Sequence, residues 1–341
     1  MQAIRLHEIG KGPAGLRYEE VPDPEPGPGE TLIRLHAAAL NRRDLFVTYG
    51  QYPGARPEVL PVILGSDGSG EVVAQGDGAE TMPPEGSEVV INPALYWGED
   101  QTKPGKDYRI LGLPDDGTFA QLVKVPTENV FRKPSHLTHE QAAAFPLAAL
   151  TAYRALVTRG GVREGETVVV TGAGGGVATF LVQLAHALGA RVFVTSGSDE
   201  KIQKAKELGA EGGVNYRSEN WVRELKEITG GGADLSVDSV GGEVFNALVS
   251  LAKPGSRIVT FGATAGPVPK LVLPRIFLKH LTVLGTAMGS NVDFEGALRL
   301  YGERGLIPVI SKTFGLEETR QAMEYMESGE GMGKIVLRIP Q

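Results

Sequence analysis

One short stretch constrains the fold more than any other part of the chain. Residues 167–171 (TVVVT) run directly into the glycine-rich turn 172–178 (GAGGGVA), and an apolar segment then continues to Leu188. After Gly189, a second apolar run begins at Arg191. Only a backbone without side chains lets a pyrophosphate approach a helix N-terminus, where free N–H groups and the helix dipole bind it. The order strand, turn, helix, strand therefore predicts a dinucleotide-binding parallel sheet rather than a purely structural turn.

The end of the second strand favours one dinucleotide. It reads Val-Thr-Ser-Gly-Ser over residues 194–198, without the acid that usually binds the ribose hydroxyls of NAD. Ser196 and Ser198 would face a 2′-phosphate instead, and Lys201 follows one helical turn later as a charge partner. The alternative is that Ser198 or Asp199 only caps the next helix and Lys201 is a solvated surface charge. The predicted cofactor is NADP(H).

The sequence pattern changes near residue 139. Before it, closely spaced Pro and Gly residues separate short β-like runs such as 31–36 and 71–74, which predicts an irregular β-rich region. After it, helical segments alternate with short runs that are apolar on both faces, a pattern typical of a doubly wound parallel sheet. The predicted helices are 139–159, 175–188, 198–208, 218–229 and 241–252, and the predicted strands are 167–171, 191–195, 235–238, 257–261 and 281–285.

Composition excludes several classes of function. A length of 341 residues favours two domains. The 34 basic and 41 acidic residues give a net charge of −7, so a nucleic-acid partner is not expected. The chain has no Cys, which excludes disulfides, thiol nucleophiles and cysteine-based zinc sites. No apolar stretch is long enough for a signal core or a membrane span, so a cytoplasmic protein without a membrane partner is expected.

Nearly the whole chain resembles the medium-chain dehydrogenase/reductase superfamily. The resemblance rests on the glycine turn and on several shorter motifs. It implies a β-rich GroES-like catalytic domain (1–130 and 288–341), a Rossmann NADP-binding domain (131–287) and an active site in the cleft between them. The shorter motifs are 39–44 (ALNRRD), 64–72 (LGSDGSGEV), 117–120 (GTFA), 141–144 (QAAA), 150–153 (LTAY) and 333–337 (GKIVL).

The chain departs from the zinc-dependent members of that superfamily. Where they carry the ligands of a catalytic zinc, this chain has Asn41, Ser66 and Leu147, which cannot supply three strong N, S or carboxylate donors. The segment 92–112, which corresponds to their structural zinc lobe, also lacks Cys. Among the six His residues only His136 and His139 have ligand-like spacing, and they flank a helix start where a surface role is expected. No metal is predicted.

The closest pattern within the superfamily is the zinc-free quinone oxidoreductase branch, which implies that Asn41 and Tyr52 are catalytic. Ser66 is a weaker donor candidate and Arg42 a charge partner. The alternatives are that Asn41 only positions the cofactor, that Tyr52 is loop packing, and that Arg42, Arg43 and Asp44 form a structural ion-pair cluster. The cofactor-binding residues implied by the motifs are Asn41, Thr151, Gly174, Gly175, Gly176, Val177, Ser196, Gly197, Ser198, Lys201, Tyr216, Ser239, Val240, Gly262, Ala263, Thr286, Met288 and Lys334.

These features predict an NADPH-dependent enzyme that transfers hydride to a quinone or an α,β-unsaturated carbonyl without zinc. Two alternatives stay open: a zinc-free carbonyl or secondary-alcohol reductase, and a non-catalytic NADPH-binding redox sensor. Residues 281–286 (LTVLGT) would be an apolar edge strand, and in relatives this strand pairs across a two-fold axis, so a homodimer is expected. The alternative is that the loop 265–280 folds over that edge.

Overall fold

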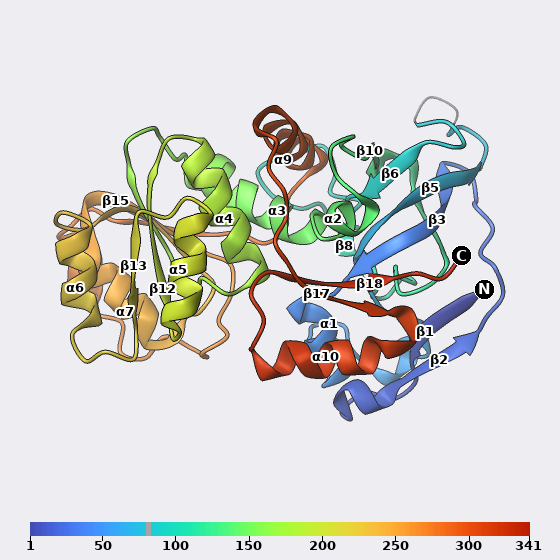
Figure 1. Cartoon of the computed structure of the whole chain (residues 1–341), viewed down its shortest axis with the longest axis horizontal. Helices are drawn as coiled ribbons and strands as arrows, with labels where there is room; N and C mark the ends of the chain where they lie inside the picture. Colours follow the sequence, from blue (N-terminus) through green and yellow to red (C-terminus); the bar gives the residue numbers. More distant parts are fainter. Residues whose placement is uncertain (80–82) are drawn as a thin grey trace. The chain divides into compact units, whose positions relative to one another are not determined.

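The computed structural model describes residues 1–79 and 83–341, which divide into two compact units (Figure 1). Unit 1 comprises Met1–Ala148 and Gly289–Gln341, and unit 2 comprises Ala149–Met288. The sequence analysis assigned residues 131–148 to the nucleotide-binding domain. In the structure, α2 (His139–Ala143) packs against strands of unit 1, which explains why the unit extends to residue 148.

Unit 1 is built around a seven-stranded sheet with the order β10-β6-β5-β3-β18-β17, in which β9 also pairs with β3. Strand β18, near the C-terminus, lies antiparallel to β3 with Val336 opposite Ala39. The C-terminal segment therefore completes the sheet that the N-terminal segment begins. The strands are β1 (Gln2–Leu6), β2 (Leu16–Glu20), β3 (Glu30–Ala39), β4 (Val62–Ile63), β5 (Asp67–Gln75), β6 (Glu88–Ile91), β7 (Ala94–Leu95), β8 (Arg109–Ile110), β9 (Leu122–Pro126), β10 (Val130–Arg132), β17 (Ile310–Gly315) and β18 (Lys334–Arg338).

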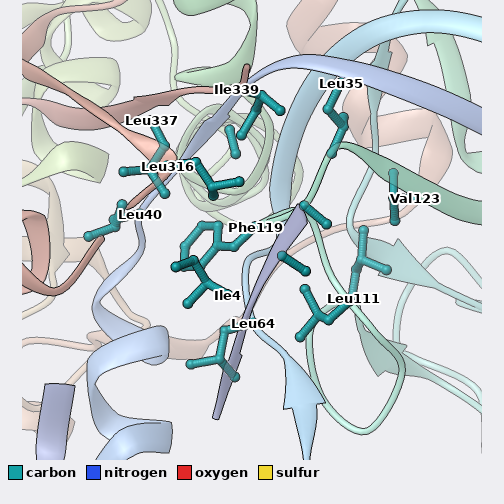
Figure 2. Packing of buried hydrophobic residues seen from close by; sticks show 14 of the residues in the cluster. Ile4, Leu35, Leu40, Leu64, Leu111, Phe119, Val123, Leu316, Leu337 and Ile339 are labelled. Carbon is teal, nitrogen blue, oxygen red and sulfur yellow. The ribbon is translucent and has the colours of Figure 1, made fainter. Parts of the chain in front are cut away.

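The helices of this unit range from five to 14 residues, and α3 leads the chain into unit 2. They are α1 (Arg42–Thr48), α2, α3 (Pro146–Tyr153), α9 (Asn291–Arg304) and α10 (Thr319–Ser328). The core of unit 1 joins residues from both ends of the chain, since Ile4 and Phe119 pack in one cluster with Leu316 and Leu337 (Figure 2). Each such side chain contributes about 1.5–3 kcal/mol when fully buried, so the C-terminal segment is an integral part of this unit.

The lobe at residues 92–112 is closed by side chains of the chain itself. Strands β7 and β8 form a two-stranded hairpin. The Arg109 guanidinium lies 4.4 Å from the centre of the Tyr96 ring and forms an ion pair with Asp115. The rings of Trp97 and Tyr108 meet edge to face. An aromatic and ionic cluster thus holds the lobe together.

Unit 2 contains a six-stranded parallel sheet with the order β13-β12-β11-β14-β15-β16. This is the strand order of a doubly wound dinucleotide-binding fold, in which the order reverses next to the first strand. The predicted fold class, a β-rich domain with a Rossmann domain, is confirmed. The elements are β11 (Thr167–Val170), α4 (Gly176–Ala187), β12 (Arg191–Ser196), α5 (Asp199–Glu207), β13 (Gly212–Asn215), α6 (Trp221–Ile228), β14 (Ala233–Asp238), α7 (Gly242–Leu251), β15 (Ala252–Thr260), α8 (Leu273–Phe277) and β16 (Thr282–Gly285).

Three elements differ from the predicted pattern. Helix α8 lies within the segment 265–280, which was expected to be a loop. Strand β13 was not predicted because its sequence, Gly-Gly-Val-Asn, has little β propensity, and pairing with β12 holds it in place. The predicted helix 139–159 is three pieces: α2, α3 and the π-helical turn Arg154–Arg159. The break precedes Pro146, whose ring disfavours a helical backbone at Phe145.

None of the helices in the described ranges combines the length and apolar character that a membrane crossing requires.

Candidate active site

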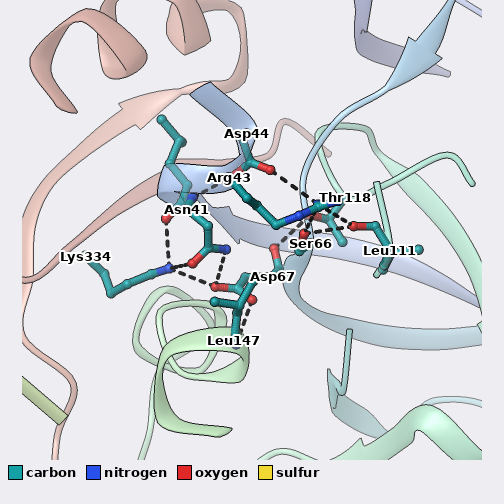
Figure 3. A network of polar contacts seen from close by, with 10 residues as sticks. Asn41, Arg43, Asp44, Ser66, Asp67, Leu111, Thr118, Leu147 and Lys334 are labelled. Atoms are coloured by element: carbon teal, nitrogen blue, oxygen red, sulfur yellow. Dashed lines mark hydrogen bonds and ion pairs between the residues drawn. The ribbon is translucent and has the colours of Figure 1, made fainter. Parts of the chain in front are cut away.

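The first cluster of polar residues in unit 1 forms where β3 ends and α1 begins (Figure 3). Asn41 has an extended backbone and precedes the first turn of α1. Its backbone N–H donates to Oδ2 of Asp44 at 2.8 Å. This carboxylate lies at a helix N-terminus, where negative charge is favoured, and it holds Asn41 at the start of the helix.

Lys334 reaches Asn41 from the first position of β18, which places it next to the end of β3. Its ammonium donates to the Leu40 carbonyl oxygen at 2.8 Å, to Asn41 Oδ1 at 2.5 Å and to Asp67 Oδ2 at 2.8 Å. A lysine ammonium has three N–H donors, so all of them are used within the chain. Lys334 and Asp67 are 2% and 0% exposed, and they form a buried, fully hydrogen-bonded ion pair.

Asp67, the first residue of β5, connects four other segments, since it also binds Lys334. Its Oδ2 also accepts a bond from Asn41 Nδ2 at 2.9 Å, and its Oδ1 accepts the backbone N–H of Leu147 at 2.9 Å. Its carbonyl oxygen accepts a bond from Thr118 Oγ1. The first turn of α3 is therefore held by the same carboxylate that balances Lys334 (Figure 3).

Arg43 forms the second half of the cluster. Its Nη1 donates to Ser66 Oγ at 2.6 Å and to the Leu111 carbonyl oxygen at 3.0 Å. Ser66 Oγ in turn donates to the same carbonyl at 2.8 Å, so its proton points away from any external acceptor. The guanidinium lies 4.8 Å from the centre of the half-buried Tyr52 ring. Ser66 thus anchors Arg43 and is not the free donor that the sequence suggested.

Asp44 is the acid nearest to Arg43, with 3.7 Å between Oδ1 and Nη1. Burial raises the pKa of the Asp44 carboxyl to about 6, although the Arg43 charge and the Asn41 N–H act in the opposite direction. Three buried polar atoms here lack a hydrogen-bond partner: Nε and Nη2 of Arg43 and Oδ1 of Asp44. Arg43 and Asp44 therefore form the ion pair that the sequence suggested, but some of their hydrogen-bonding atoms have no partner.

The side chains at the positions that correspond to the zinc ligands do not fit a zinc ion. The Asn41 amide oxygen is bonded to an ammonium, Ser66 is a hydroxyl that donates to a carbonyl, and Leu147 contributes only its backbone N–H. His136 and His139 do not converge, because the first bonds the Leu306 carbonyl and the second bonds Ser69 and Glu88. Across residues 1–79 and 83–341, no three His, Cys, Asp or Glu side chains gather as a metal site would require.

In unit 2, the glycine turn follows β11 and leads into α4, with Gly175 at the helix N-cap. A Cβ at Gly174 would lie 2.7 Å from Cδ and 3.2 Å from Nζ of Lys201. The end of the Lys201 side chain therefore lies against the glycine turn. Burial lowers the pKa of the Lys201 ammonium, which indicates that this cation is partly shielded from water.

The end of β12 gathers the residues predicted to bind a 2′-phosphate. A Cβ at Gly197 would lie 2.7 Å from the Tyr216 hydroxyl and 3.2 Å from Arg217 Nε. Ser198 caps α5 by accepting a hydrogen bond from the backbone N–H of Lys201. The cap does not move Ser198 away from Gly197 and its neighbours, so the same residue can serve both roles. Asp199 accepts a bond from the amide of Asn215. Arg217 was not among the predicted site residues, and its place directly after Tyr216 was the only signal for it.

The other predicted cofactor residues follow the carboxyl ends of parallel strands. Ser239 and Val240 follow β14, Gly262 and Ala263 follow β15, and Thr286 follows β16. Asp238 ties this edge together by accepting bonds from Thr171 Oγ1 and from the backbone N–H groups of Val240 and Gly241. Dinucleotides bind at this edge in doubly wound sheets. Asn41 and Lys334 belong instead to the cluster in unit 1, Thr151 lies on α3, and Met288 ends unit 2 with a positive φ of 53°.

Comparisons with known proteins agree with this architecture. The family model of the alcohol dehydrogenase GroES-like domain matches residues 27–135, and that of the zinc-binding dehydrogenases matches residues 176–303. The zinc-type alcohol dehydrogenase-like protein YogA of Leptosphaeria maculans is 36% identical over 95% of this chain and 94% of its own length. The acryloyl-coenzyme A reductase of Sulfurisphaera tokodaii is 31% identical over 95% and 96%. A crystal structure of an NAD-dependent alcohol dehydrogenase superposes with a TM-score of 0.94 at 39% identity, covering all of both chains.

Proposed function

The chain belongs to the medium-chain dehydrogenase/reductase superfamily of oxidoreductases, and on that premise we propose that it transfers hydride from NADPH to a quinone or an α,β-unsaturated carbonyl without zinc. One observation carries the proposal. The positions of the zinc ligands hold Asn41, Ser66 and Leu147, and their polar groups are committed to a buried network of hydrogen bonds. A metal would have to displace both Lys334 and Arg43 to use them.

The lack of zinc ligands at positions 41, 66 and 147 determines which substrates we expect the chain to reduce. A zinc ion polarises a carbonyl and stabilises the developing alkoxide by several kcal/mol. A saturated ketone needs that help because its negative charge is localised on one oxygen. A quinone or an enone spreads the incoming charge over its own conjugated system and depends less on a Lewis acid. The name of the acryloyl-coenzyme A reductase describes such a conjugated substrate for a relative of this chain.

Two features support the proposed cofactor, namely the glycine turn after β11 and the polar residues that follow β12. Lys201 lies against Gly174, and Tyr216 and Arg217 lie next to Gly197. We expect Tyr216 and Arg217 to bind the 2′-phosphate together with Ser196 and Ser198. Bound NADPH supplies the hydride, and these residues bind and orient it. One structure that superposes on this chain is named an NAD-dependent alcohol dehydrogenase. The affinities of this chain for NADPH and NADH should therefore be compared directly.

A second candidate is the oxidation of an alcohol or the reduction of a simple ketone, which the names of the relatives favour. A non-catalytic NADPH-binding redox sensor remains as the third reading. One assay separates all three. The purified protein is given NADPH with a quinone, an enone or a simple ketone, with and without a chelator, and its zinc content is measured. We expect turnover of the quinone or enone, no effect of the chelator and no stoichiometric zinc.

Each other outcome of that assay has one meaning. Activity with simple ketones or ethanol alone supports the alcohol dehydrogenase. One zinc per chain, with activity lost to the chelator, contradicts the zinc-free mechanism. NADPH binding without turnover of any electrophile supports the sensor.

We also propose that the protein forms a homodimer through β16. This strand is the last of the parallel sheet, and its residues Thr282, Val283 and Gly285 are exposed. The neighbouring α8 region presents Phe277 and Leu278 at 61% and 73% exposure. An apolar unpaired edge is stabilised when a second copy pairs with it. Sedimentation at micromolar concentration should give the mass of two chains, and a stable single chain would contradict the pairing.

A further inference from the structure

Two cations of the chain bind the side chains at positions 41 and 66, which correspond to zinc ligands in the zinc-dependent members of the superfamily. Lys334 binds the side chain of Asn41, and Arg43 binds the side chain of Ser66. Both cations are buried, with side chains 2% and 7% exposed. Positive charge is therefore present at this place without a metal (Figure 3).

The two cations differ in what they can still bind. All three N–H donors of Lys334 are engaged by oxygens of the chain. A guanidinium has five N–H donors, and Arg43 uses the two on Nη1. Its Nε and Nη2 are buried and have no partner. Buried donors without a partner are rare in folded proteins, because each costs free energy. Arg43 is thus the cation that can donate hydrogen bonds to a further oxygen.

The surroundings leave the Arg43 charge only partly balanced. The nearest carboxylate oxygen, Oδ1 of Asp44, is 3.7 Å from Nη1, and the other oxygen of that group is engaged by the backbone of Asn41. On another side, the ring of Tyr52 lies against the guanidinium. An aromatic face tolerates a cation without neutralising it. An oxygen that carries negative charge would complete the site.

We propose that Arg43 binds the carbonyl oxygen of the substrate and holds the negative charge that develops on it during hydride transfer. This inference rests on the proposed function. Addition of the hydride to the β-carbon of an enone moves the C=C electron pair toward the carbonyl oxygen, which becomes an enolate. Water then donates a proton to the α-carbon and becomes hydroxide, and the two electrons of the reduction come from the hydride of NADPH. Arg43 stays protonated throughout.

Access to the donors involves Tyr52. Nε and Nη2 of Arg43 are shielded from solvent in the free chain. The Tyr52 ring that covers the guanidinium is half-buried and stands on the segment after α1, between Gly50 and Gly54. The substrate oxygen therefore replaces part of the contact between this ring and Arg43. Donors that are shielded from water bind an oxyanion more strongly than exposed ones, since the local dielectric is low.

The test compares Arg43→Met, which removes the charge, with Arg43→Lys, which keeps it. Arg109→Met is the matched control, because Arg109 also lies over a tyrosine ring in unit 1 but belongs to the β7–β8 hairpin. By analogy with the loss of an oxyanion donor, we expect Arg43→Met to lower kcat for an enone by roughly 100- to 1,000-fold. NADPH affinity should stay within about twofold, Arg43→Lys should recover at least about tenfold of the loss, and Arg109→Met should resemble the wild type.

A binding measurement tests the same residue without turnover. The probe is 4-nitrophenolate, an oxyanion whose absorbance reports its protonation state. We expect the wild type and Arg109→Met to bind it and Arg43→Met to bind it at least about tenfold more weakly, as expected for one charge-assisted contact. Thermal unfolding of each variant identifies a loss that comes from misfolding. Arg43→Gly is also assayed with added guanidinium, which restores the charge, and with added urea, which is similar in shape but neutral.

The outcomes separate the two proposals. A wild type that turns over no quinone or enone overturns the proposed function. A wild type that does so, together with Arg43→Met at a similar rate and with similar 4-nitrophenolate affinity, overturns the role of Arg43 alone. Recovery of Arg43→Gly by guanidinium but not by urea supports the role of the charge. Equal losses in Arg43→Met and folded Arg43→Lys, without recovery by guanidinium, assign Arg43 to packing and overturn the inference.

Discussion

The polar clusters of the two units differ in how their charges are balanced. In unit 1, Lys334 and Asp67 are buried and their bonds lie within the chain. In unit 2, Tyr216 is 43% exposed and Arg217 is exposed. Asp199, the first residue of α5, accepts a bond from the Asn215 amide instead of pairing with Arg217. The first cluster largely completes itself, whereas the second presents a surface that an anionic ligand can complete. We therefore expect substitutions of Lys334 and Asp67 to act on folding and those in the second cluster to act on ligand binding.

The largest effect on stability is expected for Lys334→Met. The change leaves the Asp67 carboxylate buried without its cation, and breaking a buried ion pair in this way costs about 3–5 kcal/mol. Urea unfolding measures the loss. Lys124→Met is the control, because Lys124 forms an exposed pair with Glu30 and should cost less than about 1 kcal/mol. Similar losses in both variants would contradict a special role for the buried network.

The next effect concerns the pH dependence of stability through Asp44. Its pKa is raised in the folded chain from the usual 3.8 to about 6, so the folded state binds the proton more tightly than the unfolded state. The associated stability is present below pH 3.8 and is lost as the pH rises to about 6. Relative to Asp44→Asn, the wild type should lose about 2 kcal/mol between pH 4 and pH 7. Unfolding curves of the two proteins that stay parallel over this range would contradict the raised pKa.

In unit 2, Lys201→Ala should act on cofactor binding and leave stability unchanged. One charge-assisted contact with the 2′-phosphate is worth about 1.5–3 kcal/mol, or roughly tenfold to a hundredfold in NADPH affinity. NADH affinity should stay nearly the same. Lys204→Ala, one turn along α5 and paired with Glu200 on the surface, is the control. Equal losses for both cofactors would place Lys201 outside the phosphate site.

The smallest effect is expected for Tyr52→Phe, which keeps the ring over Arg43 and removes only the hydroxyl. If that hydroxyl donates to the substrate oxygen, the loss of one neutral hydrogen bond should lower the enone rate by about tenfold. NADPH affinity should not change. An unchanged rate would assign Tyr52 to packing over Arg43.

Local patterns were sufficient for much of the fold. Residues 167–178 carry strand, turn and helix in one continuous stretch, and β3 and β5 contain the runs 31–36 and 71–74 that were predicted as strands. Such elements could be predicted because local composition and periodicity already indicate them. Strand β13 was missed because its pairing with β12, and not its composition, makes it a strand.

The candidate site divides in the same way. The sequence by itself determined the glycine turn, the absence of an acid at the tip of β12 and the lack of metal donors at positions 41, 66 and 147, because each depends only on which residue stands at a given position. Only the tertiary structure decided that Lys334 bonds Asn41, 293 residues away, and that Ser66 anchors Arg43. Side-chain partners depend on which strands lie side by side, and the pairing of β18 with β3 is stabilised by a core shared between both ends of the chain.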